Sequence, residues 1–288
     1  MPSITWPGPP LFSTVQASAV LQAIREGKAT AVTSFDLNRT ETEVELTSAG
    51  MEGDIGALSI AELKAIVKQD RKVFRLDRNP PEAVQVFSET TGWIRSLCPT
   101  KSAPTVLVSG IPMHRIKETD PRADTLAKIR AFGKIRGRVL DTATGLGYTA
   151  IEASLSAQEV VTVEIDPAAL EIAKLNPWSQ ELFSAPNITQ IVGDVFEEIR
   201  QFASASFEGV IHDPPTPALG GELYGIEFYG GLRRILRRGG RLFHYVGDPE
   251  GGIGRKMIPG IVRRLSESGF HRIERHPDAF GLTAIART

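Results

Sequence analysis

The chain has 288 residues, 41% of them hydrophobic, which suffices for one large domain or two ordinary ones. A formal net charge of −1 and a pI of about 6.6 provide no global positive field that would attract nucleic acid or anionic lipid. The single cysteine, Cys98, excludes a disulfide within the chain and argues against a cysteine-based metal site.

The N-terminal stretch MPSITWPGPPLFSTV lacks the basic start and apolar core of a signal peptide. No apolar run approaches the roughly 18 residues that cross a bilayer. We therefore expect a cytoplasmic protein that does not contact a membrane. Asn and Gln are scarce, with 4 and 8 residues, and Arg outnumbers Lys 23 to 10, a composition that favours a thermophilic source.

Residues 1–112 predict a smaller α+β module. Ser59 stands three residues before Glu62, which is the spacing of a capping box at a helix start. Periodicity and alternation indicate a helix over 14–28, strands over 30–37 and 41–49, a helix over 59–69, and short strands over 71–76, 83–88 and 105–110. We expect this module to recognise the substrate.

Residues 113–288 alternate strictly between helices and strands, which predicts a parallel sheet with helices on both faces. The expected helices cover 120–133, 148–157, 167–176, 195–203, 225–238 and 254–269. The expected strands cover 137–143, 159–165, 188–193, 207–213 and 240–247, with a terminal pair within 271–286. Such sheets bind ligands at the carboxyl ends of their strands.

The first of these strand ends reads VLDTATGLGYTA, residues 139–150. Gly145 and Gly147 allow a sharp turn and close approach of a ligand, and the following helix directs its N-terminal amides at that ligand. Gly145-x-Gly147-x-x-Ala150 also matches the dinucleotide fingerprint, so an NAD-linked enzyme is one alternative. Asp141 favours a cationic ligand such as S-adenosylmethionine instead, unless it merely caps the turn or helix.

Acidic residues also end the next two strands. Glu164 ends VVTVEI, where its carboxylate can accept hydrogen bonds from both hydroxyls of a ribose. Asp194, in IVGDVFEEI, is suited to accept a hydrogen bond from an adenine amino group, and it is equally suited to cap the following helix. Acids at three successive strand ends after a Gly-x-Gly turn form a specific pattern.

The fourth strand ends in VIHDPPTPALGGELYGIEFYG, residues 210–230. Proline lacks an N–H and has a fixed φ, so the carboxylate of Asp213 and the carbonyl of Pro214 can be held convergent, with Pro215 completing the turn. Two convergent acceptors can grip an amino group and direct its lone pair at an activated carbon. His212 and His244 lie on strands without metal-ligand spacing, and we interpret both as core histidines rather than general bases.

These motifs resemble the class I S-adenosylmethionine-dependent methyltransferases, over about residues 113–288, and most closely an uncharacterised group of predicted archaeal methyltransferases. The resemblance implies a Rossmann-like seven-stranded sheet with a reversed last strand and S-adenosyl-L-methionine as cofactor. Ala143 replaces the first glycine of the usual string. The implied cofactor-binding residues are Asp141, Thr142, Ala143, Gly145, Gly147, Tyr148, Glu164, Ile165, Gly193, Asp194, Val195 and Asp213.

Asp213-Pro214-Pro215 further resembles the Asp/Asn-Pro-Pro-aromatic motif of enzymes that methylate planar amino nitrogens. Thr216 replaces the aromatic residue that would stack on the target base. The candidates that could stack instead are Tyr148, Tyr224, Phe228, Tyr229 and Trp178. The resemblance implies methyl transfer to an amino nitrogen without a metal, with Asp213, Pro214 and Pro215 as the catalytic residues and RNA as the favoured substrate.

The run ELYGIEFYG also resembles spermidine synthases, in which a second aspartate holds the polyamine. That aspartate aligns with Thr216. Aminopropyl transfer from decarboxylated S-adenosylmethionine therefore remains an alternative, as do methylation of a protein or a small amine and a binding module that has lost its reaction.

Overall fold

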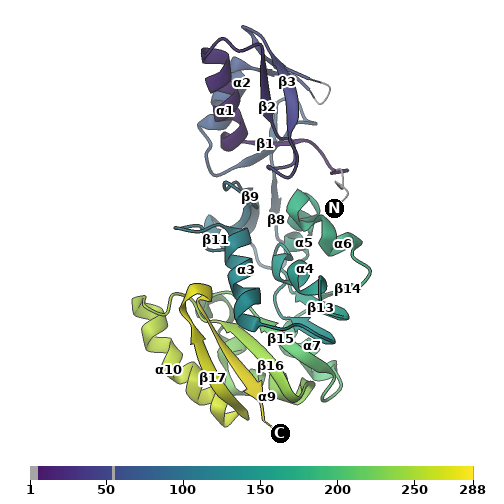
Figure 1. Cartoon of the computed structure of the whole chain (residues 1–288), viewed down its shortest axis with the longest axis vertical. Coiled ribbons are helices and arrows are strands. Elements are labelled where there is room, and N and C mark those ends of the chain that lie inside the picture. Colours follow the sequence, from purple (N-terminus) through teal and green to yellow (C-terminus); the bar gives the residue numbers. More distant parts are fainter. Residues whose placement is uncertain (1–5, 54–55, 288) are drawn as a thin grey trace. The chain divides into compact units, whose positions relative to one another are not determined.

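The computed structural model describes residues 6–53 and 56–287, and the chain divides into two compact units (Figure 1). One unit comprises the described residues up to Arg122 together with Ala168–Gln180, and the other comprises Ala123–Pro167 and the residues from Glu181 onward. Residues 113–122 and Ala168–Gln180 thus group with the first unit, whereas the sequence placed them after the boundary. The boundary at residue 112 stays a prediction. The first five residues of the stretch examined for a signal peptide lie outside the described residues.

The first unit contains three antiparallel sheets, with strand orders β1-β6-β7, β2-β3-β4-β5 and β11-β10-β9-β8. Its strands are β1 (Leu11–Ser13), β2 (Thr30–Thr33), β3 (Thr42–Leu46), β4 (Gly50–Glu52), β5 (Leu58–Ser59), β6 (Val73–Arg75), β7 (Glu82–Ala83), β8 (Gln85–Phe87), β9 (Ile94–Cys98), β10 (Thr105–Val108) and β11 (Ile111–Pro112). Its helices include α1 (Thr14–Arg25), α2 (Ile60–Val67) and α5 (Pro167–Lys174).

Local sequence signals explain where the two N-terminal helices begin. The expected capping box at Ser59 and Glu62 is present at the start of α2, where each residue satisfies the backbone N–H of the other. Ser13 and Gln16 form a second capping box at the start of α1, which the sequence analysis missed. The two helices share a core with side chains of the neighbouring sheets, including Phe12, Val20, Leu63 and Phe74.

The second unit contains one seven-stranded sheet with the order β14-β13-β12-β15-β16-β18-β17. Its strands are β12 (Arg138–Asp141), β13 (Glu159–Glu164), β14 (Ile188–Val192), β15 (Phe207–His212), β16 (Leu236–Tyr245), β17 (Phe270–His276) and β18 (Gly281–Ala286). Strands β12 to β16 pair in parallel, whereas β18 runs antiparallel to both of its neighbours. The predicted seven-stranded Rossmann-like fold with a reversed last strand is confirmed.

Helices cover the two faces of this sheet. They are α3 (Pro121–Phe132), α4 (Tyr148–Ser154), α6 (Gln180–Ser184), α7 (Val195–Gln201), α8 (Pro217–Gly220), α9 (Ile226–Ile235) and α10 (Gly252–Glu267). One face buries Leu140, Val210 and Leu242 in a core that also contains side chains of α7, α9 and α10. Successive residues of a strand point to opposite faces, so the residues between these belong to the face that carries α3 and α4.

Several boundaries differ from the sequence prediction, strand β9 was not predicted, and the most informative difference lies between α9 and β16. The periodicity predicted a helix up to residue 238, whereas α9 ends at Ile235 and strand β16 already begins at Leu236. Leu236 pairs with Phe207, and the register then shifts before Arg241 pairs with Gly209. This irregularity accommodates the arginines and glycines of 237–240, which local patterning cannot distinguish from a helix end followed by a turn.

The packing of α3 on the sheet depends on a glycine. A Cβ built on Gly209 of β15 would lie 2.4 Å from Cζ of Phe132, the last residue of α3. The ring of Phe132 therefore occupies the space that a side chain at position 209 would fill.

Gly209→Ala should consequently lower the free energy of unfolding by about 1–3 kcal/mol through overpacking, as measured by urea denaturation. Gly230→Ala is the matched control, because Gly230 is exposed on α9 with no heavy atom within 4 Å of the added Cβ. It should raise the stability by up to about 1 kcal/mol. A Gly209→Ala protein as stable as the wild type would contradict the described packing.

Candidate active site

Alternation along the strands brings several polar residues of the second unit to one face of the sheet. Leu140 and Val161 point into the core on the α9 face, so Asp141 and Thr162 point to the α3 and α4 face. Asp213 directly follows β15, and by the same alternation it points to the face that carries α3 and α4. The carboxyl ends of the central parallel strands thus present their carboxylates towards α3 and α4.

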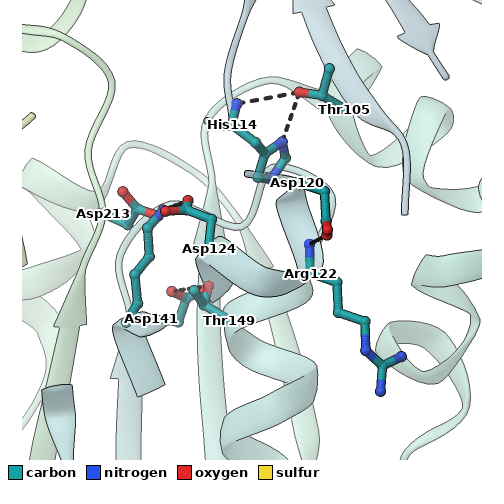
Figure 2. Close-up of polar contacts among 9 residues, drawn as sticks. Thr105, His114, Asp120, Arg122, Asp124, Asp141, Thr149 and Asp213 are labelled. Atoms are coloured by element: carbon teal, nitrogen blue, oxygen red, sulfur yellow. Dashed lines mark hydrogen bonds and ion pairs between the residues drawn. The ribbon is translucent and has the colours of Figure 1, made fainter. Parts of the chain in front are cut away.

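Asp213 forms an ion pair with a lysine that the sequence analysis did not single out. Nζ of Lys128, on α3, lies 2.6 Å from Oδ2 of Asp213 and 2.9 Å from Oδ2 of Asp124 one helical turn earlier. Figure 2 shows the side chains of Asp213 and Asp124 directed toward each other. The Lys128 ammonium also lies 4.5 Å from the ring centroid of Tyr245, at the end of β16. Lys128 and Asp124 are buried, whereas 20% of the Asp213 side chain is exposed.

The carboxylates of Asp213 and Asp124 stabilise the charged form of Lys128, whereas Asp124 disfavours the charged form of Asp213. Burial opposes the charged form of Lys128, but the carboxylates of Asp213 and Asp124 outweigh it and raise the pKa of Lys128 above its ordinary value. Burial raises the pKa of Asp213, and the adjacent Lys128 ammonium opposes that rise. Two carboxylates and one ammonium give the cluster a net charge of −1, which suits a cationic ligand.

Asp141 is fully buried, and both of its carboxylate oxygens accept hydrogen bonds from threonines. Oγ1 of Thr149 donates to Oδ1 at 3.0 Å, and Oγ1 of Thr162 donates to Oδ2 at 2.7 Å. Burial raises the pKa of Asp141 to about 7, although both hydroxyls oppose the shift. Asp141 does not cap the following helix, whose N-cap is Gly147. Contact between Asp141 and a cofactor stays a prediction.

The glycine turn is held by the acid at the end of the neighbouring strand. Gly145 and Gly147 adopt φ values of 51° and 78°, in the left-handed region that favours glycine. The backbone N–H of Gly145 donates to Oε2 of Glu164 at 2.8 Å. A Cβ on Gly145 would meet no heavy atom within 4 Å, so the backbone borders open space there, whereas one on Gly147 would lie 2.7 Å from Leu182.

The ends of β13 and β14 carry further predicted cofactor contacts. Asp194 caps α7, because its Oδ1 accepts a hydrogen bond from the N–H of Phe196 at 2.9 Å, so the predicted cap is confirmed. Its contact with adenine stays a prediction. Ile165 is 52% exposed, an uncommon placement for an isoleucine beside a carboxylate-lined turn. Val195 lies in the core, and Gly193 donates its N–H to the Glu164 carbonyl.

A hydrogen bond from Tyr224 fixes the segment after β15. The hydroxyl of Tyr224 donates to the carbonyl of Pro215 at 3.0 Å, and Pro214 is buried. Thr216, the residue in place of the expected aromatic, is exposed. The Asp-Pro-Pro turn is therefore attached to the segment before α9, and this attachment holds Asp213 at the strand end.

The remaining predicted contacts of the glycine turn are largely buried. Thr142 and Tyr148 are buried, and Ala143 is half-buried. Oγ1 of Thr142 hydrogen-bonds with Nδ1 of His212 at 2.7 Å. Cofactor contact by these three residues stays a prediction.

Both candidate histidines lie on the α9 face as core residues. Nε2 of His212 lies 3.0 Å from the carbonyl of Leu223, and Nε2 of His244 lies 2.9 Å from the hydroxyl of Tyr229. Burial lowers the pKa of His212 to about 3 and the pKa of His244 well below its ordinary value. Both imidazoles are neutral at physiological pH, so the interpretation as core histidines is supported.

The residues considered for stacking on a base are not well exposed. Tyr148, Tyr224, Phe228 and Tyr229 are buried. Trp178, in the first unit, has the guanidinium groups of Arg39 and Arg122 over its ring at 5.8 and 5.5 Å. Four of the five rings are thus buried, and two guanidinium groups lie over the fifth.

Comparisons with known proteins show the family of this chain. Residues 116–249 match the family model described as methyltransferase small domain. The chain is 40% identical over 261 residues to the uncharacterized protein MJ1233 of Methanocaldococcus jannaschii, and the match covers 88% of each protein. The chain belongs to the family of this archaeal protein, and the family-model match over residues 116–249 fits the class I methyltransferases that the sequence resembles.

Similarity to aminopropyltransferases covers a smaller part of the chain. Polyamine aminopropyltransferase 2 of Streptomyces coelicolor is 31% identical over 142 residues, which is 46% of this chain and 26% of that protein. A spermidine synthase structure in complex with the analogue AdoDATO aligns with a TM-score of 0.55 at 18% identity, over 74% of this chain and 75% of its own. The spermidine synthase of Thermotoga maritima aligns with a TM-score of 0.53 at 17% identity, over 74% of each chain. At these identities, the two alignments concern only the fold of this chain.

The most informative residues that sequence reasoning missed are Asp124 and Lys128. Their spacing of four, continued by Phe132, places all three on one face of α3, and all three are buried. That spacing is visible in the sequence. Burial of the two charges is not, because it depends on Asp213, which lies 85 residues further along the chain.

The described residues contain neither a membrane-spanning helix nor a cluster of metal ligands. Over 6–53 and 56–287, no helix is both long and apolar enough to cross a membrane. Among the same residues, no group of three or more His, Cys, Asp or Glu side chains is arranged to hold a metal ion. A reaction without a metal stays a prediction.

Asp141 should make the stability of the protein depend on pH. Its folded-state pKa of about 7 lies above the ordinary value of about 3.9, so the folded state binds an extra proton between these values. Stability should therefore fall as the pH rises from about 4 to about 7. Asp141→Asn mimics the neutral form and should flatten the fall in Tm across this window, as measured by circular dichroism.

Asp194→Asn is the control for this measurement, since Asn caps a helix about as well as Asp and Asp194 is exposed. Its Tm profile should keep the wild-type slope. An Asp141→Asn protein with the wild-type slope would show that Asp141 is ionised throughout the window.

Proposed function

We propose that this protein transfers a methyl group from S-adenosylmethionine to an amino nitrogen held by Asp213. The observation that carries the proposal is the state of the Asp213 carboxylate. Its Oδ2 is occupied by Lys128, while Oδ1 makes no hydrogen bond within the described part of the chain and points away from the ion pair (Figure 2). A fixed carboxylate with one available oxygen is suited to accept a hydrogen bond from an amine.

The residues at the neighbouring strand ends fit S-adenosylmethionine. Gly145 borders open space that a Cβ would enter, the Glu164 carboxylate is anchored beside it, and Ile165 exposes an apolar surface suited to an adenine ring. The cluster around Asp213 carries a net negative charge that favours a cation. When bound, the cofactor supplies a methyl group on a sulfonium, and an amine lone pair displaces the sulfide from that carbon.

The chain itself contributes orientation, desolvation and a place for the proton. Asp213 accepts a hydrogen bond from the amine N–H and thereby directs the nitrogen lone pair. Tyr224 holds the Pro215 carbonyl, which fixes the turn that presents Asp213 and the Pro214 carbonyl. The methylated nitrogen then releases one proton, either to Asp213 or to water.

RNA is the substrate class that we propose to test first. The support is the resemblance of Asp213-Pro214-Pro215 to enzymes that methylate planar amino nitrogens. Thr216 and the buried tyrosines do not offer the usual stacking surface, so base recognition would depend on other groups, including the N-terminal module. Proteins and small amines are the other outcomes of the same experiment.

Aminopropyl transfer is the second candidate. The partial similarity to polyamine aminopropyltransferases and the net negative charge around Asp213 favour it. Thr216 counts against it, because a polyammonium substrate would lack the second carboxylate.

Label from methyl-radiolabelled S-adenosylmethionine should enter macromolecules of a cell extract, and Asp213→Ala should reduce the rate at least about 100-fold. This variant lacks the carboxylate oxygen that accepts the hydrogen bond from the amine. Ribonuclease treatment of the labelled extract should release the counts, whereas protease should not. Glu267→Ala, an exposed change at the end of α10, is the control and should retain activity. Label released only by protease would contradict the RNA assignment, and full activity of Asp213→Ala would contradict the role of Asp213.

Calorimetric titration with S-adenosylmethionine and with its decarboxylated form separates the two candidates. We expect the protein to bind S-adenosylmethionine at least as tightly as the decarboxylated cofactor, because a methyltransferase site accommodates the carboxylate. A preference for the decarboxylated form of about 10-fold or more, which is roughly 1.4 kcal/mol, would favour aminopropyl transfer. Formation of a longer polyamine from putrescine or spermidine would then confirm it.

A further inference from the structure

The most unusual group in the second unit is the buried ammonium of Lys128. Lysine is rarely buried without partners, because removing its charge from water is costly. Here Nζ lies 2.6 Å from Asp213 and 2.9 Å from Asp124, over the ring of Tyr245. The helix that carries Lys128 is fixed by Phe132, four residues further along the same face and packed against Gly209.

We propose that Lys128 is a positioning residue that keeps Asp213 ionised and leaves only one of its carboxylate oxygens for the amine. This inference rests on the proposed role of Asp213 as the acceptor. It assigns to α3 a function in the reaction that none of the sequence motifs includes.

The surroundings of Asp213 explain why a lysine is needed. Asp124 on α3 and Asp141 at the end of β12 are acids of the same buried region. The phenol group of Tyr224 lies near Asp213, and the ring of Tyr245 lies beneath the Lys128 ammonium. Lys128 is the cation that pairs with both Asp213 and Asp124. Without it, burial and the neighbouring acids would all favour the protonated form of Asp213.

Protonation would reverse the role of this carboxyl group. An ionised carboxylate only accepts hydrogen bonds, whereas a protonated one carries a donor. A donor facing the amine would engage the lone pair that must attack the methyl carbon. Lys128 therefore determines whether the nitrogen is presented with its lone pair free.

The ionisation of Asp213 can be measured without any substrate. The full chain is labelled with [¹³Cγ]aspartate, and the Asp213 signal is assigned by its disappearance in Asp213→Asn. In Lys128→Met, the midpoint of the Asp213 titration should lie about 1–3 pH units above that of the wild type. Lys128→Arg keeps the charge and should keep the midpoint near the wild-type value.

Asp124→Asn is the matched control, because it removes the other partner of Lys128 and leaves the Lys128–Asp213 pair in place. It should not raise the Asp213 midpoint. Binding of S-adenosylhomocysteine by each variant reports whether the fold and the cofactor site are intact. If Lys128→Met does not fold, the double variant Asp124→Asn/Lys128→Met, which removes one buried carboxylate with the lysine, carries the same expectation.

The labelled-transfer assay gives a second readout. Lys128→Met should lose activity at neutral pH and regain part of it as the pH rises, whereas Asp213→Ala should be inactive throughout. An unchanged Asp213 midpoint in Lys128→Met, or an activity loss equal at every pH, would overturn the proposal and leave Lys128 a structural residue. A shifted midpoint in a protein that transfers no methyl group would support the effect of Lys128 on ionisation while overturning the proposed function.

Discussion

The ion pair between Lys128 and Asp213 connects helix α3 to the end of strand β15, and the geometry of the site depends on it. One partner comes from the helix before the sheet begins, and the other comes from the fourth strand. Removing either partner would leave a charge in a poorly solvated place, which is far more costly than losing an exposed pair. Phe132, on the same face of α3 as Lys128, packs its ring against Gly209 of β15.

Strand alternation separates the chemistry of the two faces. Residues in step with Leu140 and Val210 enter a core that also buries His212 and His244. Residues out of step with them, including Asp141, form the acidic region beneath α3 and α4. A shift of one residue in β15 would exchange Asp213 and His212 between these environments. The register of the parallel sheet is therefore as important for the site as the identity of the residues.

Much of this arrangement could be predicted from the sequence. Strict alternation of helices and strands predicted the sheet, and acids at successive strand ends predicted the position of the site, because parallel strands end at one edge. The burial of Lys128 and Asp124 could not be predicted, since their stability in the interior comes from a partner distant in sequence. Local patterning likewise failed at Leu236, where pairing with β15 outweighs helical periodicity.

The buried histidines have a consequence for how the site responds to temperature. His212 and His244 are buried and neutral, so an ionisation near neutrality in this part of the second unit belongs to a carboxyl group, such as that of Asp141. Carboxyl groups ionise with almost no heat, whereas imidazoles absorb a substantial amount. The pH at which the protein changes its charge here should therefore remain nearly constant on heating, a property that a histidine-based site would not provide.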